Sequence, residues 1–121
     1  MGNRAVIVAH DTTKANKHEK IGIYVHWHGS EEDVKYILDK ANEHMVRGVD
    51  DDPNYCWARL CQIFANYITE SGMDTLRRPN YETGIGIDIV SNLDVDNGDN
   101  GVYYISNDFE IVKHTDGKEL L

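Results

Sequence analysis

The sequence has few of the residues that mark secreted, metal-stapled or nucleic-acid-coating proteins. Its 121 residues include two cysteines, two prolines and 12 basic residues against 21 acidic ones. Cys56 and Cys61 fit neither a zinc ribbon nor a CxxC redox pair, so we expect reduced core thiols. A formal net charge of −9 excludes a protein whose main role is to coat nucleic acid, because neutralising phosphates requires clustered Lys and Arg.

Long hydrophobic runs are also missing. No apolar run approaches the roughly 20 residues that span a bilayer. The opening MGNRAVIVAH lacks the long apolar segment and cleavage site of a signal peptide. We therefore expect a cytoplasmic protein that does not enter membranes. Its length predicts a single domain over residues 1–121.

Apolar residues alternate or recur at helical spacing along most of the chain. Alternation predicts strands over residues 4–10 and 20–28, and later over 85–89, 102–105 and 109–112. A capping box at Ser30 begins a first helix, expected to carry Met45 on its apolar stripe and to end near Gly48. Pro53 begins a second helix that should end near Gly72. The order ββααβββ predicts an α+β fold with an antiparallel sheet of about five strands and both helices on one face.

The stretch DVDNGDNG, residues 94–101, crowds carboxylates, amides and glycines between two strands. Three interpretations are open. Calcium binding fits poorly, because glycine falls at the fifth position, where an EF-hand has a ligand. The Asn-Gly pairs favour the positive φ angles of a hairpin turn. Two such pairs exceed the need of one hairpin, and amides with carboxylates also bind ribose hydroxyls and base edges.

Two other clusters carry candidate chemistry. His26 and His28 would share a face of a strand, but zinc would need further ligands. Arg59 lies near the start of the second helix and out of phase with the core residue Trp57, where a guanidinium and backbone N–H groups could hold phosphate. No catalytic triad, nucleophile elbow or Walker loop is present in the sequence. We expect neither an enzyme nor a metal or organic cofactor.

Taken together, GNRAVIV, IGIYVHWHG, YCWARLCQIFANYI, IGIDIV, DVDNGDNGVYYI and EIVKH resemble the first Thoeris anti-defence family of phages and mobile elements. The resemblance extends over nearly the whole chain in order. It implies a sponge in the bacterial cytoplasm that binds glycocyclic ADP-ribose signals, with cyclic oligonucleotides as further ligands of some members, and degrades neither. It also implies a homo-oligomer, a dimer or a hexamer, with pockets where protomers meet.

The same resemblance implies the binding residues. Arg59 matches an arginine of the family's helix motif, and Lys113 or His114 matches a basic residue near the last strand. Where members often carry Asn-Gly-Gly-Arg, this chain has His28-Gly29-Ser30-Glu31, which removes one positive charge from any cyclic-oligonucleotide site. Apart from the resemblance, tight binding needs the adenine buried against aromatic side chains, and the available rings are Trp57, Tyr81 and Tyr103. The amides and carboxylates expected at the ligand are Asn97 and Asp99, with Asn92 and Asp94 as alternative matches.

Two rival functions remain. An acidic chain can also inhibit a host nucleic-acid-binding enzyme by imitating its substrate, with carboxylates arrayed on one exposed face. A hydrolase of nucleotide signals would need an activated water or nucleophile beside a base. A pyrophosphate ligand is compatible with the net charge, because screening over roughly 8 Å makes local arginines decisive.

Overall fold

The computed structural model describes residues 2–10, 20–70 and 83–121. The predicted loop 11–19, most of the loop before the third strand, and the candidate Tyr81 lie outside these residues. The elements follow the predicted order ββααβββ: β1 (Ala5–Ala9), β2 (Ile21–Val25), α1 (Glu31–Glu43), α2 (Pro53–Glu70), β3 (Ile85–Ile89), β4 (Val102–Ile105) and β5 (Ile111–Thr115). Two short 3-10 helices, η3 (Val90–Asn92) and η4 (Lys118–Leu120), complete the described elements.

The five strands form one sheet in the order β3-β2-β1-β4-β5, and the predicted α+β class is confirmed. The antiparallel prediction is wrong for one pairing. β1 and β4 run parallel, with Val6 opposite Val102, whereas the other three pairings are antiparallel. The segment AVIVA of β1 is buried at every position. Continuous apolar runs of this kind are typical of strands covered on both faces, as in parallel pairings.

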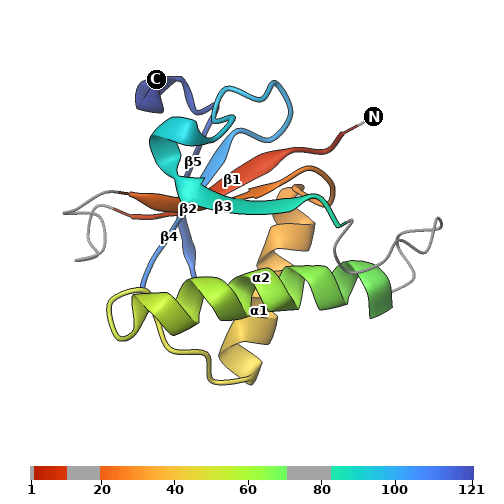
Figure 1. Ribbon diagram of the computed structural model, residues 1–121, viewed down its shortest axis with the longest axis vertical. Coiled ribbons are helices and arrows are strands. Elements are labelled where there is room, and N and C mark those ends of the chain that lie inside the picture. The colour runs from red at the N-terminus through yellow and green to blue at the C-terminus, as the bar shows by residue number, and fades with distance from the viewer. Residues whose placement is uncertain (1, 11–19, 71–82) are drawn as a thin grey trace.

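Both helices pack on one face of the sheet, as predicted (Figure 1). Ala5, Ile7 and Ala9 of β1 point to this face and meet a set of fully buried helix side chains. That set comprises Val34, Ile37, Leu38, Ala41, Cys56, Leu60 and Phe64. The apolar stripe read from the second helix therefore forms the main core.

Loops and the short 3-10 helices η3 and η4, rather than α-helices, cover the opposite face. Val6 and Val8 of β1 pack there with Val90, Val95 and Tyr104. The connection from β3 to β4 crosses over β2 and β1 to reach its strand, so it is not the hairpin that its Asn-Gly pairs favoured. Its glycines still take the positive φ angles predicted for them, 75° at Gly98 and 66° at Gly101. The stretch DVDNGDNG is therefore a cover over one face of the sheet.

Helix α1 begins as predicted and ends early. The Ser30 hydroxyl accepts a hydrogen bond from Asp33 N, which confirms the cap. The helix stops at Glu43, and Met45 adopts a left-handed φ of 53°. Met45 N donates to Asn42 O and Val46 N donates to Ala41 O, the pair of bonds of a Schellman motif. The expected end at Gly48 and the expected core position of Met45 are wrong, since its side chain is 87% exposed.

Two strand predictions also need correction. β2 ends at Val25, and His28 has a φ of 62°, so His26 and His28 do not share a strand face. His26 Nδ1 instead meets the Tyr24 hydroxyl at 2.8 Å, and His28 lies beside Asp33. The last strand begins at Ile111 rather than Phe109, because Phe109 takes a left-handed φ of 63° in the turn before β5.

None of the helices in the described part of the chain has both the length and the apolar character needed to cross a bilayer.

Candidate ligand-binding site

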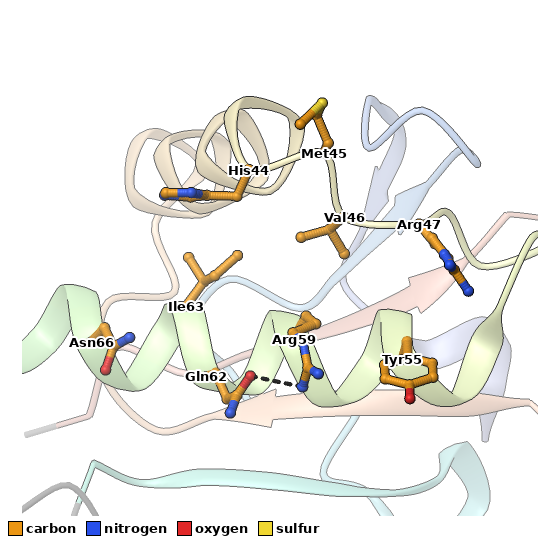
Figure 2. A pocket seen from close by; sticks show the side chains of 9 residues that line it. All are labelled: His44, Met45, Val46, Arg47, Tyr55, Arg59, Gln62, Ile63 and Asn66. Atoms are coloured by element: carbon orange, nitrogen blue, oxygen red, sulfur yellow. Dashed lines mark hydrogen bonds between the residues drawn. The ribbon is translucent and has the colours of Figure 1, made fainter.

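A second stripe of residues runs along α2 beside its core stripe. Tyr55, Arg59, Gln62, Ile63 and Asn66 recur at helical spacing and lie on the exposed or half-buried side of the helix. Figure 2 shows Tyr55, Arg59 and Gln62 projecting from the same side of α2. The loop after α1 faces this stripe and completes an open hollow of about 640 Å³. The loop contributes His44, Met45, Val46 and Arg47.

Two guanidinium groups flank one aromatic ring in this hollow. The Arg59 Cζ atom lies 5.2 Å from the centre of the Tyr55 ring, and the Arg47 Cζ atom lies 5.8 Å from it. Arg47 also donates to the carboxylate of Asp52 at 3.0 Å. Arg59 donates to the amide oxygen of Gln62 at 3.0 Å (Figure 2), a neutral acceptor, and forms no ion pair with a carboxylate among the described residues. A guanidinium in this state is available to an anion.

The local charge is opposite to that of the whole chain. Among the described residues that line the hollow, none is Asp or Glu, whereas Arg47, Arg59 and His44 are basic. The chain has a formal net charge of −9. Screening limits the reach of distant carboxylates to roughly 8 Å at physiological salt. The nearby carboxylate of Asp52 offsets the charge of Arg47, so Arg59 supplies most of the positive field in the hollow. The hollow suits an anionic ligand with an aromatic part.

The turn between β4 and β5 braces the loop that carries Arg47. The side-chain oxygen of Asn107 accepts a hydrogen bond from Asp50 N at 2.9 Å. Gly48 lies so close that a Cβ atom there would meet the same oxygen at 2.1 Å. The Asn42 amide of α1 adds a bond to Asp108 O at 3.0 Å. The arginine side of the hollow is therefore held by contacts that come from far along the sequence.

The buried amide of Asn97 organises the loop DVDNGDNG. Its nitrogen donates to Asp94 O and to Gly101 O, each at 3.1 Å. Its oxygen accepts from Asp99 N at 3.1 Å and from Gly101 N at 3.0 Å. The residue is 3% exposed. Asn97 is thus a structural centre, with its amide committed to the backbone of its own loop.

Arg4 of the N-terminal segment pairs with two carboxylates of this loop. Its Nε donates to Asp99 at 2.8 Å, and its NH1 lies 3.5 Å from Asp94. The hydrogen bond from the Arg4 side chain, joined by one from its backbone N–H, holds the pKa of Asp99 below its usual range. Pairing with one guanidinium therefore offsets the repulsion between two of the three carboxylates, those of Asp94 and Asp99.

The other predicted residues lie in different places. Asn92 is exposed and donates to Asp88 at 3.2 Å. The ammonium of Lys113 on β5 lies 4.8 Å from the centre of the Tyr104 ring on β4. Trp57 is 6% exposed within the core, so its ring is not open to a ligand. Tyr103 is also buried, and burial raises the pKa of its hydroxyl to about 12.

A second hollow, of about 460 Å³, lies beside the loop DVDNGDNG. Its lining includes the carboxylates Asp96, Asp99 and Asp116 and one ammonium, that of Lys118. A phosphate group would meet net repulsion there. Of the two hollows, the one at Arg59 is therefore the better candidate for a nucleotide.

Within one chain, the predicted residues do not form a single site. Arg59 belongs to the helix side of the sheet, whereas Asn92, Asp94, Asn97 and Asp99 belong to the loops on the other side (Figure 1). Sequence reasoning found Arg59 but missed Arg47, Tyr55, Gln62 and Asn66. The spacing of the stripe on α2 was the available signal for the last three.

Comparison with known proteins adds no relative: no family model matches the chain, no curated protein matches its sequence, and no solved structure matches its fold.

Proposed function

We propose that this chain binds and sequesters a cyclic nucleotide immune signal of the glycocyclic ADP-ribose type, as an anti-defence sponge in the bacterial cytoplasm. The observation that best supports this proposal is the hollow at Arg59. Its described lining is basic and contains no carboxylate, although the whole chain has a net charge of −9. Cyclic oligonucleotides are further candidate ligands of the same class. The active form is a homo-oligomer, as the resemblance implies.

The lining supplies one kind of group for each part of such a ligand. Arg59 and Arg47 suit the pyrophosphate, because guanidinium forks match phosphate oxygens in two-pronged hydrogen bonds. Tyr55 is 53% exposed, so its ring can contact the adenine beside the two guanidinium groups. The amides of Gln62 and Asn66 can both donate and accept, as ribose hydroxyls and base edges require. The volume of about 640 Å³ falls within the usual range of small-molecule sites.

The same groups favour binding over chemistry. The guanidinium and amide groups of the lining neither take up a proton nor attack a phosphorus or glycosidic carbon at neutral pH, and its described residues include one imidazole, that of His44. Binding of this kind stabilises the signal as it is, and uniform binding does not accelerate a reaction. Sequestration is therefore the function that this set of side chains supports best.

Calorimetric titration with glycocyclic ADP-ribose tests the proposal. We expect the wild-type chain to bind, and Arg59→Ala to weaken binding by about 10- to 100-fold, the size of a lost charge-assisted hydrogen bond. Lys35→Ala removes the same charge from an exposed position on α1 and should leave affinity unchanged. Absence of binding by the wild-type chain, or equal losses in the two variants, would contradict the proposal.

A further inference from the structure

The sheet has two edges, and their backbone groups can be assigned from the hydrogen bonds beside β3. His26 N donates to Gly84 O at 2.9 Å, and Val90 N donates to Lys20 O at 2.8 Å. Even-numbered residues of β3 therefore bond to β2, since bonding sides alternate along an antiparallel strand. The N–H and C=O groups of Ile85, Ile87 and Ile89 point away from the sheet. Among the described strands, none pairs with this side.

The two edges differ in how they discourage further pairing. The β5 edge has an exposed lysine, Lys113, and an irregular register between Tyr104 and Ile105. Charged side chains and bulges are the usual means by which edge strands avoid other chains. The β3 edge keeps a continuous register with β2 over five residues and carries one charge, that of Asp88. Its central side chain, Ile87, is 49% exposed.

The sequence of β3, Ile-Gly-Ile-Asp-Ile, is complementary to itself. When two copies run antiparallel about Ile87, Ile85 of each copy lies opposite Ile89 of the other. Asp88 of each copy then lies opposite Gly86, so no two carboxylates meet across the pair. The isoleucines share the helix face, because Ile87 lies opposite Ile23 and Ile85 opposite Val25, both in the helix-side core. Pairing would bury the exposed part of Ile87.

We infer that β3 pairs with β3 of a second copy of this chain, antiparallel and centred on Ile87, so that one sheet continues across the interface. In the single chain Asp88 Oδ1 accepts a hydrogen bond from Ile89 N at 2.7 Å. On pairing, the N–H group of Ile89 would leave this carboxylate and bond to the second copy. The outward groups of Ile87 form the reciprocal bonds at the centre. This inference rests on the oligomeric part of the proposed function and not on the ligand.

Substitutions at Gly86 test the pairing, because a positive and a negative side chain there should change the dimer Kd in opposite directions. A Cβ atom at Gly86 would meet only the Tyr24 Cβ at 4.0 Å, an ordinary contact, so larger residues fit. Lysine at this position would face Asp88 of the second copy, twice by symmetry, and aspartate would repel it twice. Sedimentation equilibrium without ligand should show a dimer whose Kd falls by about 2- to 30-fold in Gly86→Lys and rises by a similar factor in Gly86→Asp.

The same two charges at Val112 control for net charge. Val112 lies on β5 and is 46% exposed, so Val112→Lys and Val112→Asp change the charge of the chain at the other edge. These two substitutions should change the dimer Kd much less than Gly86→Lys and Gly86→Asp do. Thermal unfolding identifies any variant that fails to fold. If Gly86→Asp is unfolded, the dimer Kd of Gly86→Lys alone tests the β3 pairing.

Two results would overturn the β3 pairing. One is a wild-type chain that stays monomeric at every concentration up to its solubility limit. The other is a dimer whose Kd responds equally to the Gly86 and Val112 substitutions. Calorimetric titration of the same samples with glycocyclic ADP-ribose tests the proposed function separately. If the chain binds the signal but does not pair through β3, the β3 pairing is wrong and the proposed function stands.

Discussion

Arg4 and Asp99 join the N-terminal segment to the loop DVDNGDNG through two hydrogen bonds on one carboxylate oxygen. Arg4 Nε donates to Asp99 Oδ2 at 2.8 Å, and Arg4 N donates to the same atom at 3.0 Å. These two residues are 95 positions apart in the sequence. The pairing fixes the loop over the face of the sheet that the helices leave uncovered.

This pairing predicts a contribution to stability that acid removes. The pKa of Asp99 is lowered in the folded chain by the Arg4 hydrogen bonds. The stabilisation is therefore present above the ordinary carboxyl pKa and is lost as the pH falls through the lowered value. Urea unfolding from pH 7 to pH 2 should show a shallower acid decline for Asp99→Asn than for the wild-type chain. Asp39→Asn, at an exposed position on α1, is the control and should keep the wild-type slope.

The four hydrogen bonds of Asn97 predict that its removal destabilises the fold. Asn97→Ala should lower the free energy of unfolding by about 2–3 kcal/mol, because buried backbone groups of the loop lose their partners. Asn92→Ala removes an exposed amide of the same connection and should cost about 0.5 kcal/mol or less. Denaturation in urea measures both. A stable Asn97→Ala chain that only loses ligand affinity would show that this amide serves the ligand instead.

Met45 predicts a stabilising substitution. Its φ of 53° occupies the position at the end of α1 where glycine is usual, and its side chain is 87% exposed. Met45→Gly should raise the free energy of unfolding by about 0.5–1 kcal/mol relative to Met45→Ala, which keeps the Cβ atom and its strain. Equal stability of the two variants in thermal or urea unfolding would contradict the left-handed turn.

Much of the fold could be predicted because local rules and burial agree. The capping box at Ser30, the apolar stripe of α2 and the alternation in AVIVA each specify an element without information from the rest of the chain. The parallel pairing of β1 with β4 could not be read in this way. It depends on a connection that crosses two strands, and no local pattern encodes that path.

Only part of the candidate site could be predicted from the sequence, because some of its residues are brought together by long-range contacts. Arg59 stood out because it lies near the start of a predicted helix and away from the core stripe. Arg47 is brought to Tyr55 by the turn at Met45 and by Asn107, which is 57 positions from its partner Asp50. Composition likewise indicated a turn in DVDNGDNG, but not which amide would be buried, since that depends on which carbonyls the folded loop presents.

Recovery of the bound molecule shows whether the chain captures the signal without changing it chemically. Purified chain is incubated with glycocyclic ADP-ribose, freed of unbound signal and heated to unfold it, and the released compound is identified by mass spectrometry and by chromatographic comparison with the starting material. We expect release of the intact cyclic signal, in proportion to the amount of chain, and little release from Arg59→Ala. A cleaved product would assign the chain to the hydrolases, and no released compound at all would contradict binding.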